Sequence, residues 1–178
     1  MAKAMKTIAI LTVIGAIICS VLYRYSSADV FLPLAITFGT TAYHFCIRLL
    51  IGTLIPAVTQ NGADDTKKWY QVRDWEQKLY NRLNVKAWKN KMPTYNPELF
   101  DISKHSWAEI AQAMCVSELV HETNVLFSFV PIVFTVWFGS FAVFLLTSLA
   151  GAAFDLMFVI MQRYNRPRIQ RIIRKSAK

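Results

Sequence analysis

Long apolar runs alternate with polar stretches along the chain, and four of the runs approach the length needed to cross a bilayer. A membrane-spanning helix needs about 20 consecutive, predominantly apolar residues. The pattern therefore predicts four transmembrane helices, at about residues 7–23, 30–57, 116–136 and 140–162. Pro131 lies inside the third span and predicts a kink, because proline lacks the N–H that continues the helical hydrogen-bond ladder.

The polar stretch between the second and third spans, residues 58–115, contains a helical pattern of its own within residues 67–89. Its apolar residues return to one helical face and basic residues occupy the rest. These apolar residues are Trp69, Val72, Leu79 and Leu83. The pattern predicts one amphipathic helix at the membrane interface, or alternatively a solvated helix packed on the cytoplasmic ends of the spans. Together the elements predict an all-α polytopic membrane protein with a single membrane domain.

Composition and charge agree with this fold class. The chain is 54% hydrophobic with a mean hydropathy of +0.32. Eighteen of its 20 lysines and arginines fall in the N-terminus, the central loop and the basic tail at residues 163–178. Because cytoplasmic loops of membrane proteins are enriched in these residues, we expect a cell-membrane protein with both termini and the central loop in the cytoplasm. The net charge of +9 is then a membrane-surface charge, and no nucleic-acid partner is expected.

The N-terminus combines a basic start with an apolar run, as a secretory signal peptide does. That run is about 17 residues long, longer than is usual for a signal peptide, and no small-x-small cleavage site follows it. We therefore expect a retained helix. The three cysteines lie in or beside apolar segments without paired spacing, which indicates small buried residues rather than disulfides or a zinc site.

Ionisable residues inside predicted spans are candidates for function, because charge is costly in hydrocarbon. His44 and Arg48 are four residues apart in the second span and share a helix face. Asp155 lies in the fourth span, at a depth similar to that of Arg48. We expect Arg48 to be buried with Asp155 or Glu118 as its counter-ion.

The third span begins with an E-x-x-H sequence in which Glu118 and His121 share a face. A carboxylate can orient a histidine and stabilise its charged form, which suits general-base chemistry on a hydroxyl. The same spacing occurs in metal-binding helical bundles, and His44 would then be a third ligand. A further alternative is that Glu118 and His121 simply pair with arginine or lysine side chains. The spacing alone leaves these alternatives open, and no metal site is expected.

Three segments resemble one protein family. They are "YNRLNVKAWKNKMP" at 80–93, "CVSELVHE" at 115–122 and "IMQRYNRPRI" at 160–169. In these segments the chain is similar to the bacterial glycosyl-4,4'-diaponeurosporenoate acyltransferases, small membrane proteins of carotenoid biosynthesis. The resemblance covers about residues 70–170, and its most specific part is the Q-R-Y-N-R-P-R string.

The resemblance implies transfer of a fatty acyl group to a hydroxyl of a glycolipid or other lipid at the membrane. We expect His121 to act as general base, oriented by Glu118, with His44 as an alternative base or a tunnel residue. Arg48 is expected to stabilise the oxyanion that forms on the donor carbonyl. No tightly bound cofactor is expected. The co-substrate would be an acyl-CoA or acyl-carrier donor, and the partners would be this donor, the lipid acceptor and membrane lipids.

The donor would bring phosphates to the basic C-terminal segment. The expected substrate-binding residues are Arg48, Trp88, Lys89, Asp155, Gln162, Arg163, Asn165, Arg166 and Arg168. Gln162 and Asn165, about one turn apart, are expected to hydrogen-bond to neighbouring elements. Pro167 disfavours helical geometry at Arg166 and predicts that the helix ends or bends there.

Two other functions remain compatible with the residues alone. One is a different lipid-modifying membrane enzyme, such as a methyltransferase or reductase, that uses the basic tail for a phosphorylated cofactor. The other is a non-enzymatic membrane scaffold whose polar residues hold the bundle together.

Overall fold

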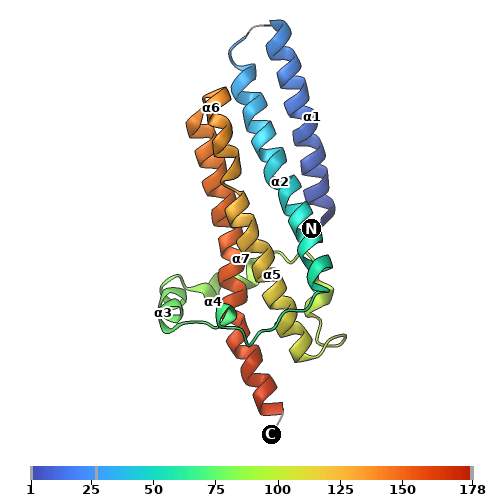
Figure 1. Cartoon of the computed structure of the whole chain (residues 1–178), viewed down its shortest axis with the longest axis vertical. Coiled ribbons are helices and arrows are strands. Elements are labelled where there is room, and N and C mark those ends of the chain that lie inside the picture. The colour runs from blue at the N-terminus through green and yellow to red at the C-terminus, as the bar shows by residue number, and fades with distance from the viewer. Residues whose placement is uncertain (1, 27, 177–178) are drawn as a thin grey trace. The chain divides into compact units, whose positions relative to one another are not determined.

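The chain folds into helices connected by turns and short loops (Figure 1). A computed structural model describes residues 2–26 and 28–176 of the 178-residue chain. The structure is 82% helical, and the described residues contain no strand. The predicted all-α fold is thus confirmed.

Four helical segments of the described chain are long and apolar enough to cross a membrane. The first is Lys3–Ser26, within α1 (Ala2–Ser26), and the second is α2 (Phe31–Thr59). The third is Trp107–Phe138, and the fourth is α7 (Phe141–Ser176). Each overlaps one of the predicted spans, and the chain is a membrane protein with four candidate spans. The helices extend beyond the predicted bounds, and which part of each lies in lipid stays a prediction.

The third candidate span is not one continuous α-helix. It consists of α5 (Trp107–Phe127), a 3₁₀ segment at Val130–Phe134 and α6 (Thr135–Phe138). Pro131 lies in the first turn of the 3₁₀ segment, so the disruption predicted at this residue is found. Gly139 and Ser140, with φ angles of 62° and 50°, then turn the chain into α7.

The last helix continues past Pro167, so the helix does not end there; that it bends there stays a prediction. α7 runs to Ser176, although an internal proline costs about 3 kcal/mol. Contacts on both sides of the proline hold the helix to the central loop. Arg166 donates to the backbone carbonyl of Tyr70 at 2.6 Å, and Gln170 donates to the Asp65 carboxylate at 3.0 Å.

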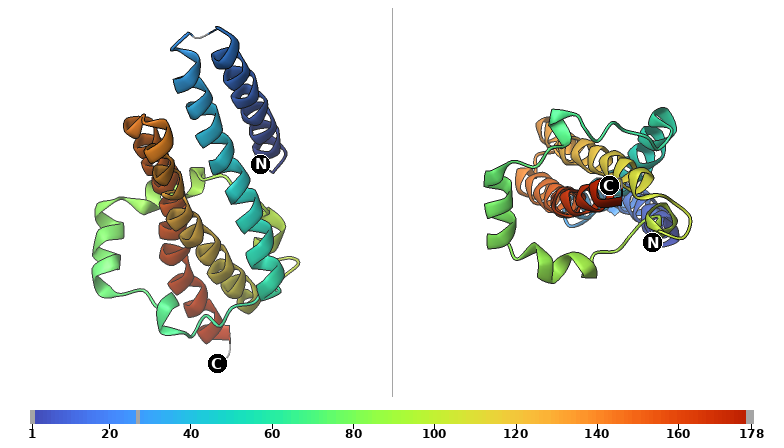
Figure 2. Two further views of the ribbon diagram at one scale, coloured as in Figure 1. Left: turned by 45° about the horizontal axis from the view of Figure 1, so that its top comes forward. Right: turned by 90° about the horizontal axis from the view of Figure 1, so that it is seen from below.

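The central loop forms several short helices, so the prediction of one amphipathic helix was wrong. A 3₁₀ turn at Lys68–Tyr70 precedes α3 (Asp74–Arg82) and α4 (Val85–Trp88), and further 3₁₀ turns follow at Lys89–Lys91 and Pro97–Phe100. Asn84, with a φ angle of 48°, separates α3 from α4. This segment runs around the C-terminal part of α7, shown in red in Figure 2.

The buried face of α3 is polar rather than apolar. Glu76 and Tyr80 are buried, whereas Trp75, Leu79 and Leu83 are exposed. The reason is electrostatic: Glu76 turns inward to pair with Arg163 of α7, and the apolar stripe faces outward as a result. An outward apolar stripe is what an interfacial helix requires, and its contact with lipid stays a prediction.

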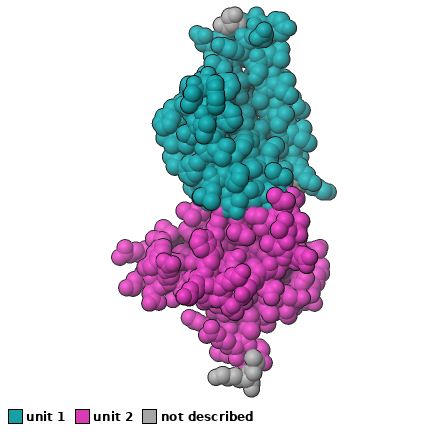
Figure 3. Space-filling model, in the orientation of Figure 1, with its two compact units in different colours: residues 1–52, 123–154 teal, residues 53–122, 155–178 magenta. Residues whose placement is uncertain are grey.

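The chain divides into two compact units (Figure 3). Unit 1 comprises Met1–Gly52 and Thr123–Phe154, and unit 2 comprises Thr53–Glu122 and Asp155–Lys178. In unit 1, α1 lies beside the first part of α2, where the Phe38 ring approaches Gly15. The prediction of a single membrane domain stays a prediction.

Unit 1 contains one very close approach between α2 and α7, at Gly151. Arg48 donates to the carbonyls of Gly151 and His44, at 2.9 Å and 2.6 Å. Backbone carbonyls thereby hydrogen-bond a charged group within an apolar span. A Cβ atom on Gly151 would lie 2.9 Å from Nη2 of Arg48 and 3.2 Å from Nδ1 of His44. A glycine is therefore required for this approach.

We expect Gly151→Ala to lower the free energy of unfolding by about 1–3 kcal/mol, because the added methyl group displaces Arg48 and His44. Thermal unfolding of the purified protein in detergent, followed by tryptophan fluorescence, measures this effect. Gly39→Ala is the matched control, since its Cβ would meet nothing within 4 Å. That change should be neutral or slightly stabilising, because alanine favours the helix. Equal Tm values for the two variants would contradict the proposed packing.

Candidate functional site

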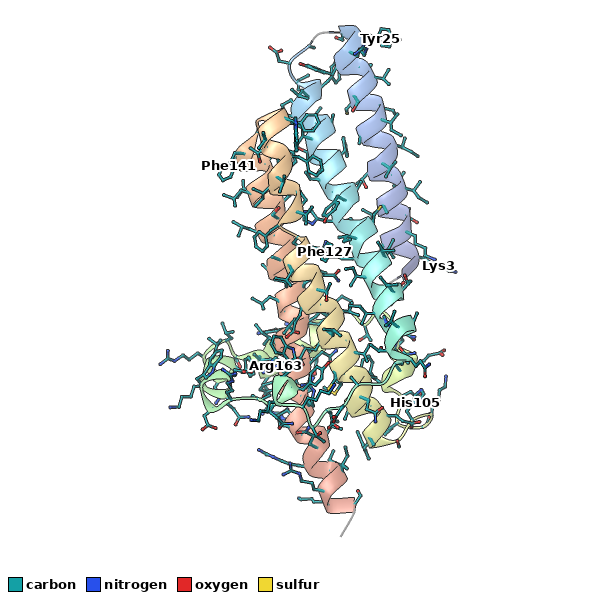
Figure 4. The ribbon with its side chains drawn as sticks, in the orientation of Figure 1. Lys3, Tyr25, His105, Phe127, Phe141 and Arg163 are labelled. Carbon is teal, nitrogen blue, oxygen red and sulfur yellow. The ribbon has the colours of Figure 1, made fainter. Side chains whose placement is uncertain are left out.

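Unit 2 is organised around a fully buried carboxylate, that of Glu118 on α5. Glu118 has 0% of its surface exposed. Its Oε1 accepts a hydrogen bond from Arg163 at 2.6 Å, and its Oε2 pairs with Arg166. The two arginines are three residues apart on α7 and so share a helix face. Figure 4 shows Arg163 among the crowded side chains where the central loop meets α7.

A second carboxylate extends this ion network to α3. Arg163 donates to both oxygens of Glu76, each at 2.8 Å, in a bidentate pair. Such pairs combine charge with planar geometry and are among the stronger protein hydrogen bonds. Tyr80, one turn along α3, donates its hydroxyl to Glu76 at 2.8 Å. One arginine thus joins three helices of unit 2.

The network shifts the pKa values of its members on α3. Burial alone would raise the pKa of Glu76, but hydrogen bonds from Arg163 and Tyr80 and the charge of Arg163 lower it below its usual value. Burial, together with the neighbouring Glu76 carboxylate, raises the pKa of Tyr80 to about 12. Glu76 is therefore ionised and Tyr80 neutral at physiological pH.

His121 pairs with Asp155 rather than with Glu118. Its Nδ1 lies 2.8 Å from Oδ1 of Asp155, and its ring stacks on Phe158 with centroids 4.4 Å apart. The side chain of Asp155 is 1% exposed, whereas that of His121 is 21% exposed. The aspartate is thus buried, whereas the side chain of His121 is partly exposed.

The prediction that Glu118 contacts and orients His121 is therefore corrected: Glu118 contacts arginines of α7 instead. The E-x-x-H spacing places both on one face of α5, but the two guanidinium groups of α7 attract the buried carboxylate more strongly than an imidazole does. The alternative in which Glu118 pairs with arginine is the one found. Arg163 and Arg166, predicted to bind donor phosphates, are already occupied by carboxylates, which a phosphate would have to displace.

The remaining predicted residues of unit 2 fall into three places. Gln162 donates to Ser117 at 3.1 Å, which joins α7 to α5. Asn165 accepts a hydrogen bond from Lys89 at 2.5 Å. Lys89 and Arg168 both lie over the ring of Tyr164, at 5.4 Å and 4.4 Å from its centroid. Trp88 bonds within its own segment, to the carbonyl of Leu83 at 3.0 Å.

Two predicted site residues, His44 and Arg48, belong to unit 1. His44 is buried, and its ring meets that of Tyr43 edge-on at 5.6 Å. Besides its two carbonyl acceptors, Arg48 lies 3.4 Å from the hydroxyl of Ser128. The counter-ions expected for Arg48 belong to unit 2, so that pairing stays a prediction.

The sequence interpretation missed the part of the network on α3. Glu76 and Tyr80 are four residues apart and so share a face, a signal that was available. It was overlooked because the tryptophan and leucine pattern of the same segment favoured a helix at the membrane interface. No sequence spacing points from either residue to Arg163, 87 positions away from Glu76.

Within residues 2–26 and 28–176, no group of three histidine, cysteine, aspartate or glutamate side chains could hold a metal ion.

The described chain thus combines apolar helices long enough to cross a membrane with a partly exposed histidine that contacts a buried aspartate. The sequence model of the glycosyl-4,4'-diaponeurosporenoate acyltransferases (CrtO) matches residues 66–175, more than half of the chain. The chain belongs to this family and is an acyltransferase of a carotenoid-biosynthesis family. The other enzyme classes and the scaffold are therefore not retained. No curated protein and no solved structure matches the chain.

The matched residues include the whole ion network and the His–Asp pair of unit 2. Glu76, Glu118, His121 and Asp155 lie within the match, as do Arg163 and Arg166. His44 and Arg48 precede it. The family match therefore covers unit 2 more completely than unit 1.

We expect Glu76→Gln to lower the free energy of unfolding at pH 7 by about 1.5–3 kcal/mol, since Arg163 loses a charged bidentate partner. The pKa of Glu76 is lowered in the folded protein. Its contribution is therefore present above the usual glutamate pKa of about 4.3 and is lost as pH falls below that value. Thermal unfolding of both proteins from pH 7 to pH 3.5 measures this, and the Tm difference should shrink at the acid end.

Glu98→Gln is the control for this experiment. Glu98 and its partner Lys104 are both exposed and lie 3.7 Å apart. An exposed pair contributes little, so Tm should be unchanged at either pH. A Tm difference between Glu76→Gln and the unmodified protein that stays constant down to pH 3.5 would contradict the assigned ion pair.

Proposed function

We propose that the protein transfers a fatty acyl group from an activated thioester to a hydroxyl of a glycolipid, with His121 as general base and Asp155 as its positioning carboxylate. The observation that carries this proposal is the 2.8 Å contact between Nδ1 of His121 and Oδ1 of Asp155. Membership in the acyltransferase family supports the reaction class, and the glycosylated substrate in the family's name supports a glycolipid acceptor.

In this proposal Nε2 of His121 is the nitrogen that accepts the proton, and the contact between Nδ1 and Asp155 supports this assignment. With Nδ1–H donating to the Asp155 carboxylate, Nε2 carries the lone pair that can accept a proton. The buried aspartate also stabilises the imidazolium that forms when Nε2 is protonated. The partial exposure of the His121 side chain is compatible with the approach of a lipid hydroxyl.

The reaction then needs two proton transfers. Nε2 of His121 takes the proton of the acceptor hydroxyl as the oxygen attacks the carbonyl carbon of the thioester. The tetrahedral intermediate collapses, the carbon–sulfur bond breaks, and the imidazolium returns the proton to the leaving thiolate. The products are the acylated glycolipid and a free thiol.

Glu118 has a positioning role in this proposal. Its ion pairs hold α7 against α5, with Glu118 three residues before His121 on one helix and Arg163 eight residues after Asp155 on the other. Fixing the helices at these charges fixes the approach of the aspartate to the histidine. Loss of Glu118 would therefore reduce the catalytic rate indirectly.

The remaining assignments rest on the sequence. The donor would be an acyl-CoA or an acyl-carrier conjugate that arrives from the cytoplasm, where the charge distribution places both termini. Arg48 as oxyanion stabiliser and His44 as tunnel residue or alternative base stay predictions. No tightly bound cofactor is required by the proposed chemistry.

We expect His121→Ala to reduce kcat by about 10²–10⁴-fold, because general-base assistance is lost. Asp155→Asn should also lower kcat strongly, since an amide cannot stabilise the imidazolium and favours the wrong tautomer. The measurement is acyl transfer from radiolabelled acyl-CoA to extracted glycolipid by protein in detergent. Thermal unfolding confirms that each variant is folded.

The remaining histidine, His105, supplies the control. His105 lies outside the ion network, near Glu109 on the exposed part of unit 2, and His105→Ala should leave turnover unchanged. If folded His121→Ala retains full activity while His44→Ala is inactive, the base is His44 and the proposal is overturned.

A further inference from the structure

Two cations of unit 2 gather on one aromatic ring. Lys89, at the start of the 3₁₀ turn after α4, and Arg168 of α7 lie over the ring of Tyr164. Nη2 of Arg168 also donates to the Tyr164 hydroxyl at 2.6 Å. Residues from two distant parts of the chain thus bring two positive charges to one place.

These cations differ from Arg163 and Arg166 in their counter-ions. Arg163 and Arg166 are held by Glu76 and Glu118. In the part of the chain that the structure describes, no carboxylate lies within salt-bridge distance of Lys89 or Arg168. Like charges held together without a counter-ion repel each other, so the arrangement is most stable when an anion joins it.

The neutral groups around the cations complete a binding site for such an anion. Asn165 fixes the ammonium of Lys89 by a 2.5 Å hydrogen bond. The hydroxyl of Tyr164 accepts from Arg168 and keeps its own hydrogen for a further acceptor. The pKa of Lys89 is lowered by burial and then by the charge of Arg168, which agrees with two cations in close proximity.

We propose that Lys89, Arg168 and the hydroxyl of Tyr164 bind a phosphate group. Phosphate accepts hydrogen bonds from a guanidinium fork, an ammonium and a hydroxyl at the same time, which matches the three donors present. The ligand chemistry is a phosphate ester. Its source, if the proposed function is right, is the phosphorylated acyl donor, and the other source with the same chemistry is a phospholipid head group.

The location on α7 suits a donor phosphate. Tyr164 follows Asp155 by nine residues, or roughly 14 Å along the helix axis at 1.5 Å per residue. A phosphopantetheine arm can span that separation, with its thioester near the His121–Asp155 pair and its phosphate at Tyr164. Asp155 of the proposed catalytic pair and two of the proposed phosphate-binding residues, Tyr164 and Arg168, would then lie on the same helix.

The first test compares two donors in a phosphate-free detergent. Lys89→Gln and Arg168→Gln should each raise the KM for acyl-CoA by about tenfold to a hundredfold, with little change in kcat. With an acyl-N-acetylcysteamine thioester, which has no phosphate, KM should not change. Arg171→Gln is the control, because it removes an exposed charge one turn further along α7. Equal effects on both donors would overturn the proposal.

A second test does not depend on turnover. Binding of CoA to the His121→Ala protein is measured by calorimetry, with and without the Lys89 and Arg168 substitutions. Binding of phosphatidylglycerol to the same proteins is measured in the same way. Weakened CoA binding in the substituted proteins assigns the site to the donor. Weakened phosphatidylglycerol binding alone assigns it to a lipid head group. If the substitutions change the binding of neither CoA nor phosphatidylglycerol, the phosphate site is overturned. Residual acyl transfer by the His121→Ala protein bears only on the proposed function.

Discussion

The constraint on which unit 2 depends is the burial of the Glu118 charge. A carboxylate removed from water costs several kcal/mol unless cations and hydrogen bonds replace the solvent. Arg163 and Arg166 supply that replacement, and because both come from α7 they determine how α7 meets α5. Glu76 then joins α3 to the same arginine. The polar face of α3 turns inward for this reason, and its tryptophan and leucine stripe turns outward.

The elements of the fold could be predicted from the sequence far better than its contacts. Hydropathy located the four candidate spans because apolar length is a local property. The partners of Glu118 depend on which side chains two helices bring together, and the spacing of residues on one helix cannot show this. The E-x-x-H sequence therefore identified Glu118 and His121 as candidates, but it predicted that they contact each other. Both contact residues of α7 instead. Pro167 was misjudged similarly, since its local preference was outweighed by contacts of Arg166 and Gln170 with distant residues.

Unit 2 separates charges that hold the fold from groups that are available for chemistry. Arg163 and Arg166 meet their carboxylates and contribute to structure. His121, with its buried aspartate and partly exposed side chain, has the features of a base. The cations around Tyr164 have no carboxylate partner among the described residues and are suited to a ligand. Within the basic segment of α7, Arg163 and Arg166 thus stabilise the fold, and Arg168 is left to bind a ligand.

The order of residues along the chain has a consequence for biogenesis. Glu76 and Glu118 are synthesised well before Arg163 and Arg166. The two carboxylates therefore have no partner from α7 until that helix has been synthesised. Unit 2 can close only after that point, and until then its acidic residues must stay hydrated.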